Sequence, residues 1–180
     1  YGGEKAVAVY SCIAYIISIV YLIFQGIGDG SQPIFSKYYG EGNFSSLREI
    51  RKLAYWFGIA LSLVSCIIMY IARNDIGVLF GVSTEVNIEV GQIIPIFLIS
   101  VPFVAVTRIT TASFYAAEES IFSYVLTYIE PVFMLAFMFV LPQLFGGQVM
   151  IWWSTVFARI LSACLALILK SHVDRKKLTV

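Results

Sequence analysis

The sequence predicts an all-α integral membrane protein, a helical bundle of five transmembrane helices in a single membrane domain over residues 1–180. The first observation is composition: 59% of the residues are hydrophobic and only 13% are charged, against about a quarter charged in a soluble domain. The second is the mean hydropathy of +0.87. The third is that apolar residues form five runs of roughly 20 residues or more, the length that crosses a hydrocarbon core of about 30 Å.

The first predicted span covers residues 6–36 and is longer than a bilayer requires, so this helix is expected to tilt or to protrude. It ends in a segment rich in helix breakers, after which a loop is expected. The second span covers residues 53–72. The segment SLRE at 46–49 has the form of a capping box, so the helix that contains this span is expected to start there.

The third span covers residues 86–116, after a loop in which Ser83 or Thr84 is the expected N-cap. Kinks are expected at Pro95 and Pro102, because proline interrupts the hydrogen-bond pattern of a helix.

The fourth span covers residues 121–142, with Ser120 as its expected N-cap and Pro131 near its middle. Gly146 and Gly147 are expected to form the next turn. The fifth span covers residues 149–169, and the basic residue after it is Lys170, which is expected to complement the dipole at the C-terminal end of the helix.

Basic residues are distributed unevenly between the two sides of the predicted bundle. The side that carries most of them is expected to face the cytoplasm. These residues are Lys37, Arg48, Arg51 and Lys52 around the first loop, and Lys170, Arg175, Lys176 and Lys177 after the last span. We therefore expect a multi-pass protein of the plasma membrane with a cytoplasmic C-terminus. The chain opens at Tyr1 without an initiator Met, so we expect a fragment that has lost a preceding span.

Several function classes are disfavoured by composition and motifs. The formal net charge is only +1, so no nucleic-acid partner is expected. The phosphate-binding motif G-x-x-x-x-G-K-[ST] does not occur. A metal site is not expected, because His172 is the single histidine and Cys12, Cys66 and Cys164 lack ligand spacing. We expect no enzyme and no cofactor, and a proton or sodium gradient as the energy source for transport.

Four ionisable residues fall inside the predicted spans: Asp29, Arg108, Glu130 and Arg159. A charge at the bilayer centre costs about 2.5–3.5 kcal/mol on insertion scales, so each is expected to face the bundle or a wet cavity. Each lies about ten or eleven residues from the cytoplasmic end of its span, which corresponds to a depth of about 15 Å. Two acids and two bases are therefore expected to share one layer near the midplane.

Polar side chains recur every three or four residues beside these charges, as they do along one face of a helix. The first span carries the longest such stripe, and shorter stripes of Ser and Thr lie on the third, fourth and fifth spans. The second span lacks one and is expected to be peripheral. The candidates for substrate or ion binding are Asp29, Glu130, Gln25, Gln32, Arg108, Arg159 and Tyr21.

Structural roles for the same residues stay open. An ion pair between Arg108 and Glu130 would tie the third and fourth spans together, since ions inside a membrane usually pair with one another. By the same argument, Asp29 would be a static partner of Arg159. Ser and Thr also serve as ordinary contacts between helices.

The segment GIGDGSQPIFSKYYGEGN at 26–43 resembles the signature that ends the eighth helix of MATE (multidrug and toxic compound extrusion) transporters. The opening YGGEKAVAVYS resembles the approach to that helix. The segments SFYAAEES and YIEPVFMLAFMFVLPQLFG, with the following tryptophan pair, resemble helices ten to twelve. On this resemblance the chain corresponds to helices eight to twelve, without the N-terminal lobe and the seventh helix.

The resemblance implies most of one lobe of a twelve-helix antiporter with two pseudo-symmetric lobes. Such a protein exports organic, often cationic, compounds against sodium or protons by alternating access. Its partners would be a small organic substrate, membrane lipid and the missing lobe and seventh helix. Several relatives carry an acid midway along the tenth helix, where this sequence has Val104. Glu130 and Asp29 are the expected substitutes, on the basis of their depth.

Two other functions stay open. A lipid-linked oligosaccharide flippase of the same superfamily would favour an excess of cationic charge in its cavity. A non-transporting helical subunit would have all of its midplane charges paired and no continuous cavity. Part of a transporter cannot open alternately to the two sides of the membrane, so the isolated chain is not expected to transport.

Overall fold

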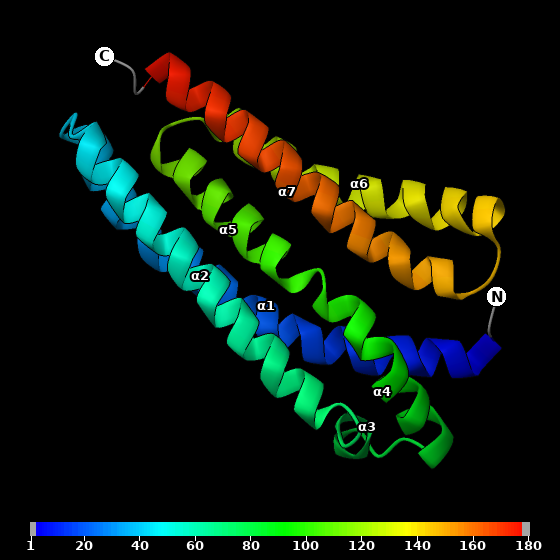
Figure 1. Cartoon of the computed structure of the whole chain (residues 1–180). Helices are drawn as coiled ribbons and strands as arrows, with labels where there is room; N and C mark the ends of the chain where they lie inside the picture. Colours follow the sequence, from blue (N-terminus) through cyan, green and yellow to red (C-terminus); the bar gives the residue numbers. More distant parts are fainter. Residues whose placement is uncertain (1–2, 178–180) are drawn as a thin grey trace.

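A computed structural model describes residues 3–177, without the side chain of Lys177, so the sequence-based inference about Tyr1 lies outside the described residues. The predicted all-α fold class is confirmed, since all regular secondary structure in this range is helical (Figure 1). The helices are α1 (Gly3–Gly40), α2 (Phe44–Ala72), α3 (Ile76–Leu79), α4 (Thr84–Leu98), α5 (Val101–Ala116), α6 (Ser120–Phe145) and α7 (Val149–Lys177).

Helix α5 is the centre of the bundle. It packs against α1 and α2 on one side and against α6 and α7 on the other (Figure 1). The two outer pairs are antiparallel hairpins, as their short connections require. The start of α1, the short α3 and the turn between α6 and α7 lie at one end of the bundle. The turns after α1 and α5 lie at the other end, with the C-terminal end of α7.

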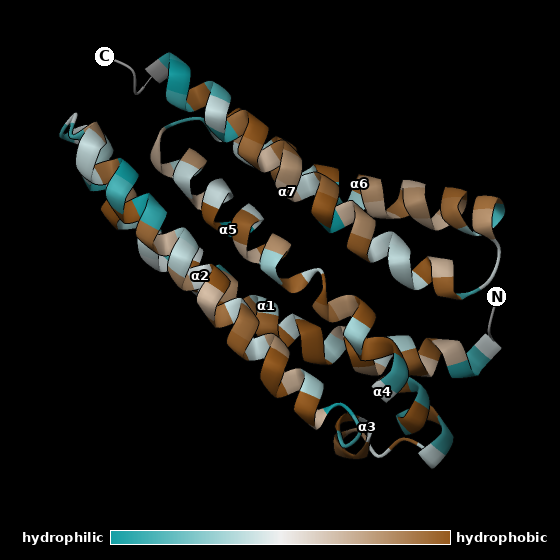
Figure 2. Cartoon of the chain, in the orientation of Figure 1, coloured by the Kyte–Doolittle hydropathy of each residue, from teal (hydrophilic) through white to brown (hydrophobic). Residues whose placement is uncertain are grey.

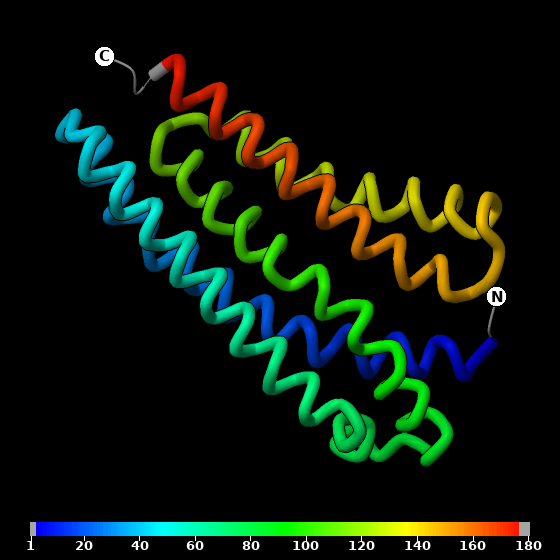
Figure 3. The backbone as a smooth tube through the Cα atoms, in the orientation of Figure 1, coloured from blue at the N-terminus to red at the C-terminus, as the bar shows by residue number. Residues whose placement is uncertain are grey.

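Helices α1, α2, α6 and α7 are each long and apolar enough to cross a membrane. Helices α4 and α5 pass the same test together, as one span with a bend of 48°. The sequence predicted a single kinked helix over 86–116, but the structure has a break between Leu98 and Val101 (Figure 3).

The break follows from local chemistry at Ser100 and Pro102. The Ser100 hydroxyl donates to the Phe97 carbonyl over 2.6 Å, and the Ser100 N–H donates to the same carbonyl over 3.0 Å. Pro102 lies in the first turn of α5, where its missing N–H leaves no helical hydrogen bond unmade. The backbone therefore restarts as a new helix instead of bending within one.

The start of α2 differs from the prediction. The prediction of a capping box at 46–49 is wrong, because Asn43 caps the helix. The Asn43 Oδ1 accepts a hydrogen bond from the Ser46 N–H over 3.1 Å. Gly42, at a φ of 66°, turns the chain so that Asn43 reaches this position.

The other predicted caps have mixed outcomes. Ser120 is the first residue of α6, and Glu119 precedes it without a side-chain cap, so the predicted Ser120 cap is also wrong. Ser83 caps α4 as predicted, its hydroxyl accepting from the Val86 N–H over 3.5 Å.

The helices extend beyond the apolar segments. Helix α1 continues through Pro33 to Gly40, and α6 continues through Pro142 to Phe145. Helix α7 runs to Lys177, so Lys170 lies within the helix. The prediction that Lys170 lies at the C-terminal end of the helix is therefore wrong. The hydrophilic residues of these extensions gather at the two ends of the bundle (Figure 2).

Two helices present mainly apolar surface to their surroundings. In the most apolar 18-residue window, only 6% of α6 and 17% of α2 is buried, against 33% of α1 and 44% of α7. Among the exposed large side chains of α2 and α6 are Leu53, Ile71, Ile121 and Phe139. These faces are suited to contact lipid, whereas the buried core lies between α1, α4 and α5.

Gly28 determines how closely α1 approaches α5. A Cβ atom added at Gly28 would lie 3.3 Å from the Arg108 carbonyl oxygen and 3.5 Å from the Ala112 Cβ, whereas one added at Gly26 would meet no atom within 4 Å. Small residues allow this kind of close contact between membrane helices.

We expect Gly28→Leu to destabilise the bundle by about 1–3 kcal/mol, because the extra atoms overpack the α1–α5 contact. Gly26→Leu is the matched control, since it adds the same side chain to the same helix in open space. Thermal unfolding in detergent measures both. Equal melting temperatures for the two variants would contradict this account of the contact.

Candidate functional site

Glu130 on α6 and Arg159 on α7 form an ion pair inside the apolar part of the bundle. The distance from Arg159 Nε to Glu130 Oε1 is 3.2 Å. The Arg159 side chain is 13% exposed and the Glu130 side chain is 25% exposed. The predicted Arg108–Glu130 pair does not form between these described residues. The reason is that α6 packs far more extensively on α7 than on α5, so its carboxylate meets the arginine of α7.

Two more elements hold the Arg159 guanidinium. Its Nη1 donates to the Ser100 hydroxyl over 3.1 Å, at the break between α4 and α5. The Tyr21 ring of α1 lies against it, with 4.6 Å from Cζ to the ring centroid. This is a cation–π contact, and it strengthens where water is excluded. Arg159 therefore joins α1, the α4–α5 break, α6 and α7 at one point.

A pocket of about 250 Å³ opens beside this ion pair, and we call it the central pocket. Arg108, Glu130 and Arg159 all line it, so three of the four predicted intramembrane charges share one cavity. Its other lining side chains are largely apolar or aromatic. They include Tyr10, Ile17, Tyr21, Phe97, Val104, Pro131 and Met134.

A second pocket of about 240 Å³ lies further along α1, and we call it the Asp29 pocket. The Gln25 Nε2 donates to both carboxylate oxygens of Asp29, over 2.9 and 3.1 Å. Asp29 thus pairs with Gln25 and not with Arg159, which Glu130 already occupies. The predicted site residues Gln25, Asp29, Gln32 and Arg108 line this pocket, with Gly28, Thr111, Ala112, Tyr115 and Thr127.

The environment of Asp29 is an open cavity and not the closed interior of the bundle. We predict that each of the four charges faces the bundle or a wet cavity, and Asp29 lines the Asp29 pocket while it and Gln25 are exposed on the described surface. Helical spacing places Asp29 on the polar face of α1, and that face turns toward the gap between α1 and α6, which the described residues leave open. Arg108 lines both pockets and separates them.

The Ser and Thr stripes are mostly satisfied within their own helices. Thr107, Thr111 and Thr127 each donate to the carbonyl four residues earlier, over 2.9–3.1 Å. Ser123 is different, because its hydroxyl donates to the Thr111 carbonyl over 3.0 Å and links α6 to α5. The hydroxyl oxygens of Thr111 and Thr127 keep acceptor capacity toward the Asp29 pocket, which they line.

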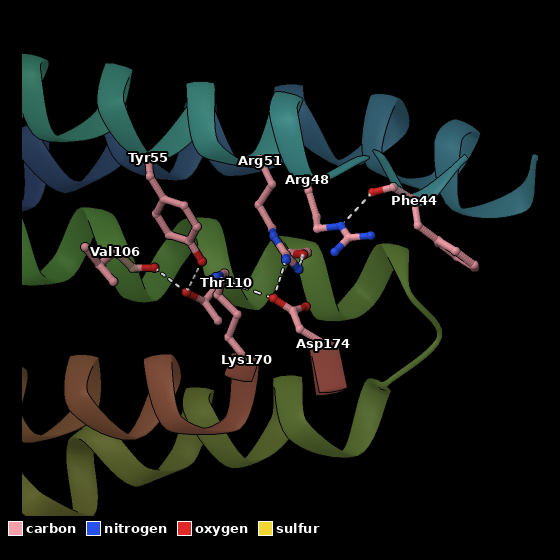
Figure 4. A network of polar contacts seen from close by, with 9 residues as sticks. Phe44, Arg48, Arg51, Tyr55, Val106, Thr110, Lys170 and Asp174 are labelled. Carbon is pink, nitrogen blue, oxygen red and sulfur yellow. Dashed lines mark hydrogen bonds and ion pairs between the residues drawn. The ribbon is translucent and has the colours of Figure 1, made fainter. Parts of the chain in front are cut away.

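Sequence reasoning missed a polar network near the C-terminal end of α7. Arg51 of α2 is 5% exposed; it pairs with Asp174 of α7 and donates to the Ser113 hydroxyl over 3.3 Å (Figure 4). Lys170 also pairs with Asp174, over 3.5 Å.

A hydroxyl contact belongs to the same network. The oxygens of Tyr55 and Thr110 lie 2.7 Å apart and join α2 to α5 (Figure 4). Arg51 and Tyr55, four residues apart on one helix face, were the available signal. The sequence places Arg51 only among the basic residues that flank the first loop, and the last predicted span ends at 169, before Asp174.

Polar and charged groups lie within an apolar helical bundle in this chain. This arrangement is typical of multi-pass membrane proteins that have a hydrophilic site in their interior. The MatE family model matches residues 1–140, and the chain belongs to this family. The resemblance to MATE transporters seen in the sequence is therefore confirmed.

A solved structure supports the fold. It is described as the outward-facing conformation of a multidrug resistance MATE family transporter of the MOP superfamily, and it matches with a TM-score of 0.91 at 17% identity. The match covers 99% of this chain and 41% of that chain, so the present chain spans about two fifths of that transporter's length. No curated protein matches the sequence.

We expect Asp174→Ala to lower the stability of the bundle by up to about 3 kcal/mol, because the buried Arg51 guanidinium loses its counter-charge. The double variant Arg51→Met with Asp174→Leu is expected to recover most of the loss, since the buried Arg51 charge is removed together with its partner, while the Lys170 side chain is 27% exposed and reaches water. Lys52→Gln is the control, because it removes an exposed charge from α2, the helix that carries Arg51. Thermal unfolding in detergent checks all three. A double variant no more stable than Asp174→Ala would contradict the ion-pair explanation.

Proposed function

We propose that this chain forms part of one lobe of a secondary antiporter that exports organic, often cationic, compounds in exchange for protons or sodium. The single observation that carries this proposal is the Glu130–Arg159 pair beside the central pocket. Ionisable residues inside a membrane bundle are costly, and they typically mark ion and substrate pathways.

Glu130 is our candidate for the coupling residue. It is the acid that holds Arg159, and Arg159 in turn contacts α1 and the α4–α5 break. Binding of a proton or sodium to Glu130 would neutralise the carboxylate and weaken its hold on Arg159. The contacts among four elements would then change with the ion-binding state, which is the kind of two-state element that coupling requires.

The break between α4 and α5 supports a carrier role. Non-helical backbone at membrane depth is tolerated where it lines a cavity, and broken helices are common at transporter binding sites. Here the break supplies Ser100 to Arg159, and Phe97, in the last turn of α4, lines the central pocket. Motion at this break would reach the ion pair directly.

The setting of the antiporter follows from charge distribution and surface. We propose a plasma-membrane transporter, and we place the C-terminal end of α7 in the cytoplasm because the basic residues gather at that end. Lipid would cover the apolar faces of α2 and α6. The remainder of the transporter would complete the substrate path.

In the complete transporter, Glu130→Gln is expected to abolish gradient-driven export of an organic cation while expression stays normal. The amide cannot exchange a proton or hold sodium with a negative charge. Uptake into inverted vesicles with an imposed proton or sodium gradient measures this. Glu49→Gln, an exposed acid on α2, is the matched control and is expected to transport normally. Normal export by Glu130→Gln would defeat the coupling assignment.

A membrane-impermeant maleimide tests the orientation. We expect Ser45→Cys, beside the turn after α1, to react only when the reagent reaches the cytoplasmic side. Thr84→Cys, at the start of α4, is expected to react only from the opposite side. Both positions are exposed. The reverse pattern in intact cells would overturn the proposed orientation.

A further inference from the structure

The Asp29 pocket contains an acid and a base that do not contact each other. Asp29 on α1 and Arg108 on α5 both line this cavity of about 240 Å³. The described residues provide no ion pair for either side chain, although six such pairs occur elsewhere among residues 3–177. The cavity therefore has opposite charges on its walls with free space between them.

Neighbouring groups prepare the Asp29 carboxylate without neutralising it. The side-chain amide of Gln25 donates hydrogen bonds from Nε2 to both Asp29 carboxylate oxygens, which fixes the orientation of the carboxylate. A carboxylate accepts about four hydrogen bonds, so acceptor capacity remains on the side of the pocket. The Asp29 carboxylate therefore still offers acceptor oxygens to a cation or an N–H donor.

Within residues 3–177, Arg108 forms no ion pair with an acidic side chain. Glu130, the other acid beside it, is bound to Arg159 at 3.2 Å. The Arg108 guanidinium carries five N–H donors in a planar arrangement that matches a carboxylate. A guanidinium within an apolar span needs an anionic partner, because the unpaired charge is costly there.

The rest of the lining consists mostly of groups that donate or accept hydrogen bonds. They are the side chains of Gln32, Thr111, Tyr115 and Thr127. Gly28 contributes no side chain to this wall, and its backbone packs closely against Arg108 and Ala112 of α5. A cavity of this size suits a small polar group, since pockets for drug-sized ligands are usually about 300–1,000 Å³.

We propose that the Asp29 pocket is a subsite for a zwitterionic group, with its cationic end at Asp29 and its carboxylate at Arg108. This inference rests on the proposed transport function and specifies the substrate class, because a simple cation would leave Arg108 without a partner. The central pocket, with its paired Glu130, then serves the coupling ion, while the Asp29 pocket serves the substrate.

Three small probes with the same ring test this assignment. They are para-aminomethylbenzoate, which is a zwitterion, benzylamine, which is a cation, and benzoate, which is an anion. Calorimetric titration of the complete transporter in detergent at neutral pH measures their dissociation constants. We expect the zwitterion to bind at least ten-fold more tightly than either of the other two probes.

Two substitutions separate the two charged contacts. Arg108→Gln is expected to reduce binding of the zwitterion to the level of benzylamine. Asp29→Asn is expected to reduce it to the level of benzoate. Glu49→Gln and Lys52→Gln, exposed charges on α2, are matched controls that leave all three constants unchanged. Arg108→Lys, which keeps the charge, is expected to retain the preference for the zwitterion at lower affinity.

The outcomes are decisive without the variants, should one of them fail to fold. Wild-type affinities that are equal for zwitterion and cation would overturn the proposal, as would no binding of any probe because another part of the transporter fills the pocket. No gradient is needed for these titrations. Loss of zwitterion preference with normal Glu130-dependent export would reject the subsite alone. Zwitterion preference with export unaffected by Glu130→Gln would reject the coupling role alone.

Discussion

The need to hold a guanidinium inside an apolar bundle is the constraint on which the rest of this structure depends. Lipid offers no hydrogen-bond acceptors to a charge, so protein groups must supply them. Arg159 is held by the Glu130 carboxylate, the Ser100 hydroxyl and the Tyr21 ring. These groups come from α6, the α4–α5 break and α1. The position of one arginine on α7 is therefore linked to the relative placement of most of the bundle.

The two polar regions of the bundle have different characters. The network around Arg51 closely connects α2, α5 and α7 at one end, with Asp174 shared between Arg51 and Lys170. Its ion pairs and hydrogen bonds join three helices directly, which suits a structural connection. The pockets beside Arg108 combine charged and polar side chains with open space. Incompletely satisfied polar groups are expensive to keep in a protein, and they are usually retained where a ligand completes them.

Local sequence patterns predicted the fold class and the position of each apolar segment. Hydrophobic length alone separates membrane spans from loops, because the bilayer imposes a minimum. The motifs in 26–43 and 113–146 indicated the MATE family. Two caps were predicted wrongly, since Asn43 caps α2 in place of Ser46, and α6 begins at Ser120 itself, after Glu119, which makes no side-chain cap. The break at Ser100 was foreseen only as a kink, because proline spacing does not distinguish a bend from a restart.

Reading along the chain is enough to find Asp29, Arg108, Glu130 and Arg159 as ionisable residues on polar helix faces inside apolar spans. Their partners follow from the packing of the helices: Glu130 meets Arg159, Asp29 meets Gln25, and Arg108 lines two pockets. The packing also brought Arg51 to Asp174 across more than a hundred residues. The physical reason is that periodicity places a side chain on one face of its own helix. Which face meets which neighbour depends on the packing and rotation of all the helices together.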